Sequence, residues 1–305
     1  MTGGPGSIPA LLALARQRVD AFRVGGDPAF VMDPRADDEV EALLSALGPR
    51  TDAQLVGDAL EACAWLHWCQ YQALPGAPGR RQRLGASLAI FKALAAARPA
   101  ALPEELRAFT STITAGPHGW AQLAVATLSG ELPPELPTPP RLLAVDLLHC
   151  AVLRLPPEDP DRAAMIFDLS AAYRDAYEHG RDIKDLEEAT NLAEAGLEIT
   201  RTDAADLPSR LSDYSICLAM LAAVRGSAQE AAAAVRISEQ AVAAITPDDE
   251  DRGRVLSNCA RAYAIAYQWS QSPGMLARAV ALGTEAVAAT PLTDPYQPGR
   301  LHTLG

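Results

Sequence analysis

The residues best suited to catalysis or metal binding are five histidines and five cysteines, scattered along 305 residues. Cys63, His67 and Cys69 come closest to a set of metal ligands. On a helix, Cys63 and His67 share a face because they are four residues apart, whereas Cys69 points away from that face. A zinc ion needs ligands that converge on one point. The pattern therefore favours a packing role for His67 over metal binding.

The neighbouring pair His149 and Cys150 suggests a catalytic dyad, but adjacent residues on a helix point about 100° apart. We interpret this pair as core packing, and His118 with Gly119 as a turn at the start of a helix. The acidic run 248–251 lacks the glycine and the spaced carboxylates of a calcium loop. It is predicted to be a solvated turn whose carboxylates favour the start of the next helix.

The cysteines are odd in number and most lie in apolar helical patterns, which predicts reduced, buried thiols instead of a disulfide framework. They are Cys63, Cys69, Cys150, Cys217 and Cys259. The chain has only two lysines, Lys92 and Lys184, and no phosphate-binding glycine loop surrounds either. Dinucleotide-binding, serine hydrolase and zinc protease motifs are also missing. We therefore predict a protein that is not an enzyme and that has no cofactor and no metal.

The charge balance restricts the class of partner. The chain has 26 Lys and Arg against 38 Asp and Glu, which gives a net charge of −12. Such a surface repels phosphate backbones and anionic lipids. No apolar run approaches the length of about 20 residues that a membrane span needs, and no basic segment precedes the apolar stretch 8–15. The sequence predicts a cytoplasmic protein without nucleic-acid or membrane partners, and it leaves the oligomeric state open.

The elements that would position any site are predicted to be helices throughout, because Ala, Leu, Arg and Glu dominate and strand patterns are missing. In the first half, helices are expected at 8–23, 37–47, 52–73, 81–97, 103–112 and 118–128. Five prolines in the segment 131–140 predict a stiff connector. The chain is thus expected to comprise an N-terminal helical region at 1–130, the connector at 131–140, and a repeat region at 141–305.

The second half repeats itself with a period of 45 residues. Four apolar residues mark the repeat starts, at Ile166, Leu211, Leu256 and Leu301. A fixed period of this size predicts a solenoid, in which each unit buries its apolar face against its neighbours. Helical hairpins are expected near 163–200, 207–246 and 252–290, and the fourth start predicts that the repeats continue past Gly305. Residues that recur in register should be buried between helices, namely Tyr173, Tyr263, Leu192 and Leu282.

Each repeat resembles the tetratricopeptide repeat, with a longer period than the usual 34 residues. The third repeat carries its pattern at Leu256, Cys259, Ala260, Tyr263, Ala279, Ala286 and Pro291. The segments 256–260, 276–291 and 299–305, with a weaker copy at 161–200, are similar to long actinobacterial arrays that often precede a CHAT domain, a caspase-like peptidase fold. The resemblance implies an all-α, right-handed superhelical solenoid. A degenerate repeat is also expected in the first half, around Leu60–Tyr71 and Leu84–Pro99.

The resemblance further implies that the first helix of each hairpin lines a concave groove that binds a protein or peptide. Asp168, Asp213 and Asn258 lie 45 residues apart at the place that contacts the bound segment in this family. The full set of predicted contact residues is Asp168, Arg174, Asp175, Asp213, Arg254, Asn258 and Arg261. Because two of them are acids, we expect a basic or mixed-charge partner segment.

We therefore predict a non-catalytic scaffold or sensor module in a CHAT-peptidase-like bacterial signalling or defence system. Two alternatives stay open. One is a regulator that senses a peptide or a small molecule. The other is an enzyme with an unfamiliar all-helical site, for which the tryptophan-rich helix at 65–71 is the candidate.

Overall fold

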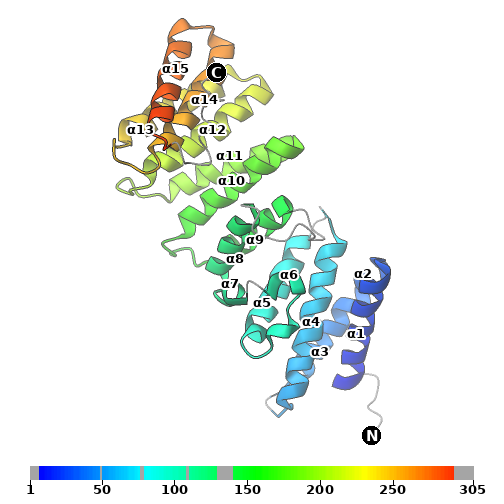
Figure 1. Ribbon diagram of the computed structural model, residues 1–305. Coiled ribbons are helices and arrows are strands. Elements are labelled where there is room, and N and C mark those ends of the chain that lie inside the picture. The colour runs from blue at the N-terminus through cyan, green and yellow to red at the C-terminus, as the bar shows by residue number, and fades with distance from the viewer. Residues whose placement is uncertain (1–6, 49, 76–78, 108–109, 129–139, 292–305) are drawn as a thin grey trace. The chain divides into compact units, whose positions relative to one another are not determined.

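The computed structural model describes residues 7–48, 50–75, 79–107, 110–128 and 140–291, and these segments contain helices and no strands (Figure 1). The predicted all-α class is confirmed. The chain divides into two compact units, a first unit at Met1–Pro156 and a second unit at Pro157–Gly305, and each is described by itself. None of the described helices combines the length and the apolar character that crossing a bilayer requires.

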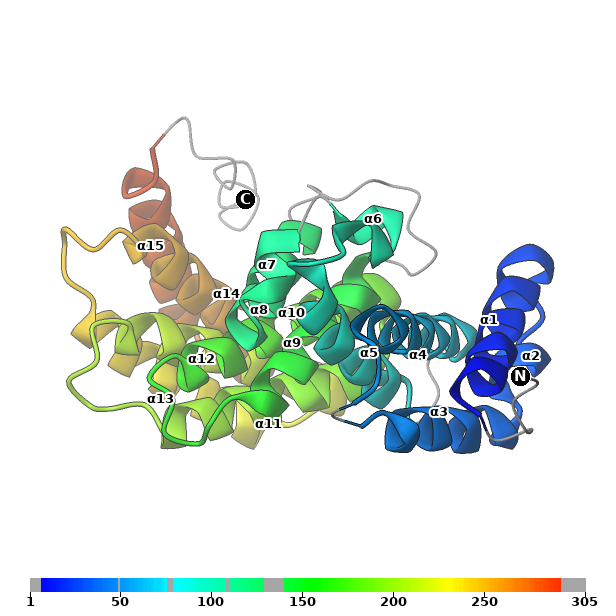
Figure 2. The ribbon, with the colours of Figure 1, turned by 90° about the horizontal axis from the view of Figure 1, so that it is seen from below.

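The first unit is built from short and long helices that follow the predicted segments. They are α1 (Ile8–Gly25), α2 (Ala29–Met32), α3 (Pro34–Ala46), α4 (Ala53–Ala73), α5 (Arg80–Ala95), the 3-10 helix η1 (Pro99–Ala101), α6 (Glu104–Arg107), α7 (Thr110–Thr114), α8 (Pro117–Leu128) and α9 (Pro140–Arg154). The helix α2 was not expected from the sequence. In both views α1, α2 and α3 lie together at one end of this unit (Figures 1 and 2).

The helices α4 and α5 form the central hairpin of the first unit. The helix α4 begins at Asp52, whose carboxylate accepts hydrogen bonds from the backbone amides of Gln54 and Leu55. Its apolar side packs against α1 and closes a core that includes Cys63 and Leu66, both fully buried. The helix α9 packs against α5 and α8 and belongs to this unit.

The predicted connector at 131–140 lies outside the described residues, except for Pro140, where α9 begins. The repeated hairpins begin with α10, close to the expected start near residue 163, and the division between the units falls after Pro156, so α9 belongs to the first unit. The sequence missed this because the apolar residues of α9 continue the helical pattern without a break, although they pack on α5 and α8. The fourth repeat start, Leu301, also lies outside the described residues.

The second unit consists of three successive helical hairpins, with bounds close to those predicted. They are α10 (Arg162–Gly180) with α11 (Ile183–Glu198), α12 (Leu207–Arg225) with α13 (Ala228–Ala244), and α14 (Arg252–Ser270) with α15 (Pro273–Ala288). The second helix of one hairpin packs against the first helix of the next, as α11 does on α12 and α13 on α14. The last two hairpins lie side by side in both views (Figures 1 and 2).

The 45-residue period also appears in the turns, where the sequence did not reveal it. Each first helix ends at a residue with left-handed backbone, at Arg181, Gly226 and Gln271. A short polar residue follows and precedes the second helix, as Asp182 and Ser227 do with side chains that accept amide hydrogen bonds. Each hairpin is therefore closed by the same turn of two residues.

Of the four residues expected to be buried between helices, three are buried. Tyr173, Tyr263 and Leu282 are buried, whereas Leu192 is only partly buried. Ile237, at the equivalent place of the second hairpin, is also partly buried. In the first two hairpins this position therefore lies at the rim of the interface, which the period alone could not distinguish from its centre.

Candidate partner-binding face of the second unit

The predicted contact residues lie on the first helices α10, α12 and α14 of the three hairpins. Four of them form one network. The Arg254 guanidinium donates to both carboxylate oxygens of Asp213, at 2.9 and 2.8 Å, and the Asn258 amide donates to Asp213 Oδ1 at 3.0 Å. Arg174 approaches the same carboxylate, with Nη1 at 3.6 Å from Oδ1.

This network neutralises Asp213. Its side chain is only 17% exposed, and it is surrounded by three groups from two other helices, Arg254 and Asn258 of α14 and Arg174 of α10. Arg254 is held in addition by Asp251, whose Oδ2 lies 3.0 Å from Nη2 and also accepts a hydrogen bond from Ser209. Asp213 thus joins neighbouring hairpins, and its charge is already satisfied within the protein.

Asp168 differs from Asp213 although the repeat register makes them equivalent. It is exposed, and among the described residues it has neither a hydrogen bond nor an ion pair. Surrounding protein and the nearby Asp213 carboxylate raise the pKa of Asp168, while Arg210 and Arg254 oppose that shift. An acid whose pKa is raised by folding is harder to ionise in the folded state, so ionised Asp168 disfavours folding at neutral pH.

Arg261 and Glu178 connect the first and third hairpins. Arg261 Nη1 donates to Glu178 Oε1 at 2.9 Å, and both side chains are partly exposed. Because α12 packs between the flanking hairpins, this contact indicates that α10 and α14 lean toward each other on the polar side of α12. Asp175, the remaining predicted residue, pairs with His179 one turn along α10, where the His179 Nδ1 to Asp175 Oδ1 distance is 3.5 Å.

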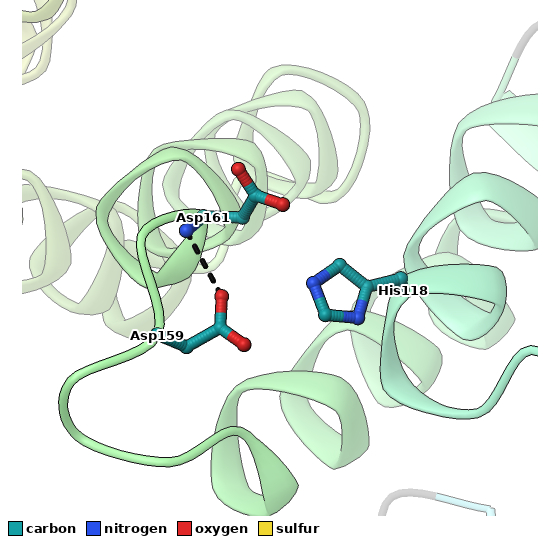
Figure 3. A group of neighbouring side chains, drawn as sticks. All are labelled: His118, Asp159 and Asp161. Carbon is teal, nitrogen blue, oxygen red and sulfur yellow. Dashed lines mark hydrogen bonds between the residues drawn. The ribbon is translucent and has the colours of Figure 1, made fainter.

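The sequence did not identify Ser209, Asp251 and Glu178 as members of this face. Asp161, Asp206 and Asp251 precede the first helices at the same 45-residue spacing, and that spacing was the signal available for Asp251. The acidic run 248–251 is an inter-hairpin turn, as predicted, in which Asp249 accepts a hydrogen bond from the Asp251 amide. The equivalent turn before α10 has the same bond, from the Asp161 amide to Asp159 (Figure 3).

Figure 3 also draws His118, which belongs to α8 of the first unit. Asp159 and Asp161 belong to the second unit, so neither unit contains all three residues.

The candidate metal residues of the first unit are buried on α4, and the two candidate dyad residues lie on α9. His67 is 9% exposed, its Nδ1 is 3.0 Å from Gln70 Oε1, and burial lowers its pKa. Among the described residues His149 Nδ1 has no hydrogen-bond partner, and burial lowers the pKa of His149 to about 4. The Cys150 thiol donates to the Arg81 carbonyl oxygen at 3.3 Å and is not directed at an imidazole.

All five cysteines are buried thiols outside any disulfide, as predicted. Burial raises the pKa of Cys63 and Cys150 to about 11 and that of Cys259 to about 12. Because the thiolate is the reactive form, we expect these thiols to react with Ellman's reagent at neutral pH only after unfolding. The measurement is the number of thiols titrated in buffer and in concentrated guanidinium chloride. Fast reaction of several thiols in buffer would contradict the burial described here.

The comparisons with known proteins do not assign this all-helical chain, with its stacked hairpins, to a family. No family model, no curated protein and no solved structure matches it.

Proposed function

We propose that the second unit is a non-catalytic docking module that binds a basic or mixed-charge segment of another protein along α10, α12 and α14. The observation that carries the proposal is Asp168, an exposed carboxylate that has no ion pair among the described residues and that is kept beside Asp213 despite the mutual repulsion. Groups kept at a cost to stability are typical of functional sites. A cationic side chain of a partner would remove that cost.

The neighbouring groups suit the same kind of partner. Arg261 and Glu178 are partly exposed. Charged side chains of a mixed-charge segment can therefore replace their ion pair with pairs to the partner. Asp213, Arg254 and Asn258 join α12 to α14, and Arg174 of α10 approaches the same carboxylate. We assign these residues a positioning role in place of direct contact with the partner. The buried cysteines with raised pKa values agree with a module that does no nucleophilic chemistry.

We further propose that the hairpins form a right-handed superhelix of the tetratricopeptide type, and that the protein is a scaffold or sensor in a CHAT-peptidase-like bacterial signalling or defence system. The support is the residue pattern of the repeats, together with the hairpin order and the packing of each second helix on the following first helix.

Asp168→Lys should abolish the retention of basic and mixed-charge peptides on this face. The test is an array of 15-residue peptides of basic, mixed and acidic composition, probed with the full chain at low and at physiological salt. Wild-type protein should retain basic or mixed peptides, more weakly at higher salt. Because Asp168 is exposed and the substitution removes its repulsion with Asp213, the thermal midpoint should stay unchanged or rise slightly.

Glu198→Lys is the matched control, because it makes the same change of charge at an exposed place on α11, a second helix. It should retain the peptides that the wild type retains. Equal loss of peptide retention in both variants would show that net charge alone explains the effect. Unchanged retention by Asp168→Lys would contradict the proposed face.

A further inference from the structure

The first unit contains a cavity of about 710 Å³ between α5 and α9, open to solvent on one side. Its lining residues come from the first turn of α5 and from one side of α9. They are Gly79, Arg80, Arg81, Gln82, Leu142, Asp146, His149, Cys150, Leu153 and Arg154. A cavity of this size is within the range of small-molecule sites.

The charges around the cavity are positive, in contrast to the acidic chain as a whole. Among the described residues that line it, three are arginines and one, Asp146, is an acid. Asp146 is 1% exposed and pairs with two of the arginines, through Arg80 Nε at 3.2 Å and Arg81 Nε at 3.0 Å. His149 adds no charge at neutral pH, because burial lowers its pKa to about 4. The lining therefore keeps an excess of two positive charges.

Arg80 is a buried residue of the cavity lining. It is 4% exposed, its guanidinium lies 4.4 Å from the centre of the Tyr71 ring, and Asp146 holds its Nε side. Its Nε and Nη1 are buried, and neither has a hydrogen-bond partner among the described residues. A buried guanidinium nitrogen that lacks an acceptor is costly unless a ligand supplies one.

The helix α5 presents its N-terminus to the same cavity. It begins after Gly79, which has left-handed backbone (φ 86°) and no side chain that could cap the helix. Among the described residues, the amide of Arg83 donates one turn back to the Gly79 carbonyl oxygen, at 3.2 Å. The amides of Arg80, Arg81 and Gln82 therefore belong to the first turn, where the helix dipole favours an anion.

Arg154 completes the cavity from α9. Its guanidinium lies 5.4 Å from the centre of the Trp120 ring, and it has no ion pair within the described part of the chain. It occupies the space above Gly85, where a Cβ atom would come within 2.5 Å of Nη1. The glycine in α5 thus allows the arginine to lie against that helix and beside the cavity.

From these observations we infer that this cavity binds a phosphate-bearing small molecule. The phosphate lies at the N-terminus of α5 and accepts hydrogen bonds from the first-turn amides and from Arg81 and Arg154. The buried Arg80 guanidinium supplies further positive charge. Guanidinium groups and helix N-termini are the groups that proteins use for phosphate. Leu142 and Leu153 form an apolar wall for the rest of the ligand, and Leu153 is 68% exposed without it.

The test uses inorganic pyrophosphate as the probe, with the full chain in isothermal titration calorimetry at low salt. We expect binding of one pyrophosphate per chain, weaker binding of inorganic phosphate, and weaker binding of both at higher salt. Arg154→Gln and Arg81→Gln should each lower the affinity for pyrophosphate at least tenfold. Gly85→Ala should also lower it, because the new Cβ displaces the Arg154 guanidinium while the charge remains.

Arg35→Gln is the matched control, since Arg35 is exposed on α3 and does not line the cavity. It should leave the affinity unchanged, and unchanged far-ultraviolet circular dichroism will show that every variant is folded. The inference is overturned if pyrophosphate produces no heat at millimolar concentration, or if the Arg81→Gln, Arg154→Gln double variant binds as the wild type does. Equal or tighter binding of citrate would overturn the assignment to phosphate. The docking proposal is tested on another unit, so the two can fail separately.

Discussion

Asp146→Ala should lower the free energy of unfolding of the first unit by about 3–5 kcal/mol, the usual loss when one partner of a buried ion pair is removed. Asp146 is 1% exposed and is surrounded by Arg80, Arg81 and Tyr71, whose hydroxyl donates to Oδ2 at 3.2 Å. Without the carboxylate, the Arg80 guanidinium stays buried as an uncompensated charge. Arg81 is 35% exposed and can turn toward water, so the larger part of the loss comes from Arg80.

The measurement is urea unfolding followed by tryptophan fluorescence, because three of the four tryptophans, Trp65, Trp68 and Trp120, belong to the first unit. Asp38→Ala is the control, since this α3 carboxylate is exposed, and it should change stability by about half a kcal/mol or less. Asp146→Asn keeps the size of the side chain but removes its charge, and we expect a loss of similar direction. A loss below about 1 kcal/mol for Asp146→Ala would show that Arg80 finds another acceptor or reaches solvent.

The stacked hairpins are the part of the fold that could be predicted from the sequence. Each repeat needs an apolar face on both helices, and this need recurs every 45 residues at positions such as Ile166, Leu211 and Leu256. Local patterns also predict the bounds of the hairpins, whose first helices include Tyr177 and Tyr267. These features follow from spacing along the chain, which a single sequence contains.

Pairing between helices could not be predicted in the same way. The register makes Asp168 and Asp213 equivalent, yet Arg254 reaches Asp213 from the following hairpin, while Asp168 has no such partner among the described residues. Ser209 holds the place 45 residues before Arg254, so the arginine that neutralises Asp213 has no counterpart in the preceding repeat. The period alone does not show that these two positions face the acids. The structure therefore divides the predicted face into a positioning network and an exposed carboxylate.

The cavity of the first unit could not be predicted either, because the residues that line it are far apart in the sequence. Asp146 stands alone within the apolar residues of α9, and a lone carboxylate in such a segment indicates a buried, paired charge. That signal was available, but its partners Arg80 and Arg81 are about 65 residues earlier in the chain. The neighbouring His149 and Cys150 drew attention to nucleophilic chemistry instead, although the arginines are the residues that line the cavity with charge.

Leu282→Ala should lower the free energy of unfolding of the second unit by about 2–5 kcal/mol, as large-to-small substitutions in cores do. Leu282 is fully buried on α15, in a cluster with Leu256, Cys259 and Tyr263. The substitution removes apolar contacts with α14 and leaves a cavity between two helices that pack extensively. Because stacked hairpins stabilise one another, the loss should spread to the α12–α13 hairpin.

The measurement is urea unfolding followed by far-ultraviolet circular dichroism, which reports on the helices of both units, with the tryptophan signal as the reference for the first unit. Val280→Ala is the matched control on the same helix, because Val280 is 48% exposed, and it should cost well under 1 kcal/mol. Leu192→Ala, at the partly buried equivalent place on α11, should give an intermediate loss. If Leu282→Ala and Val280→Ala cost the same, the interface between α14 and α15 is not packed as described, and the repeat register does not identify the core of this hairpin.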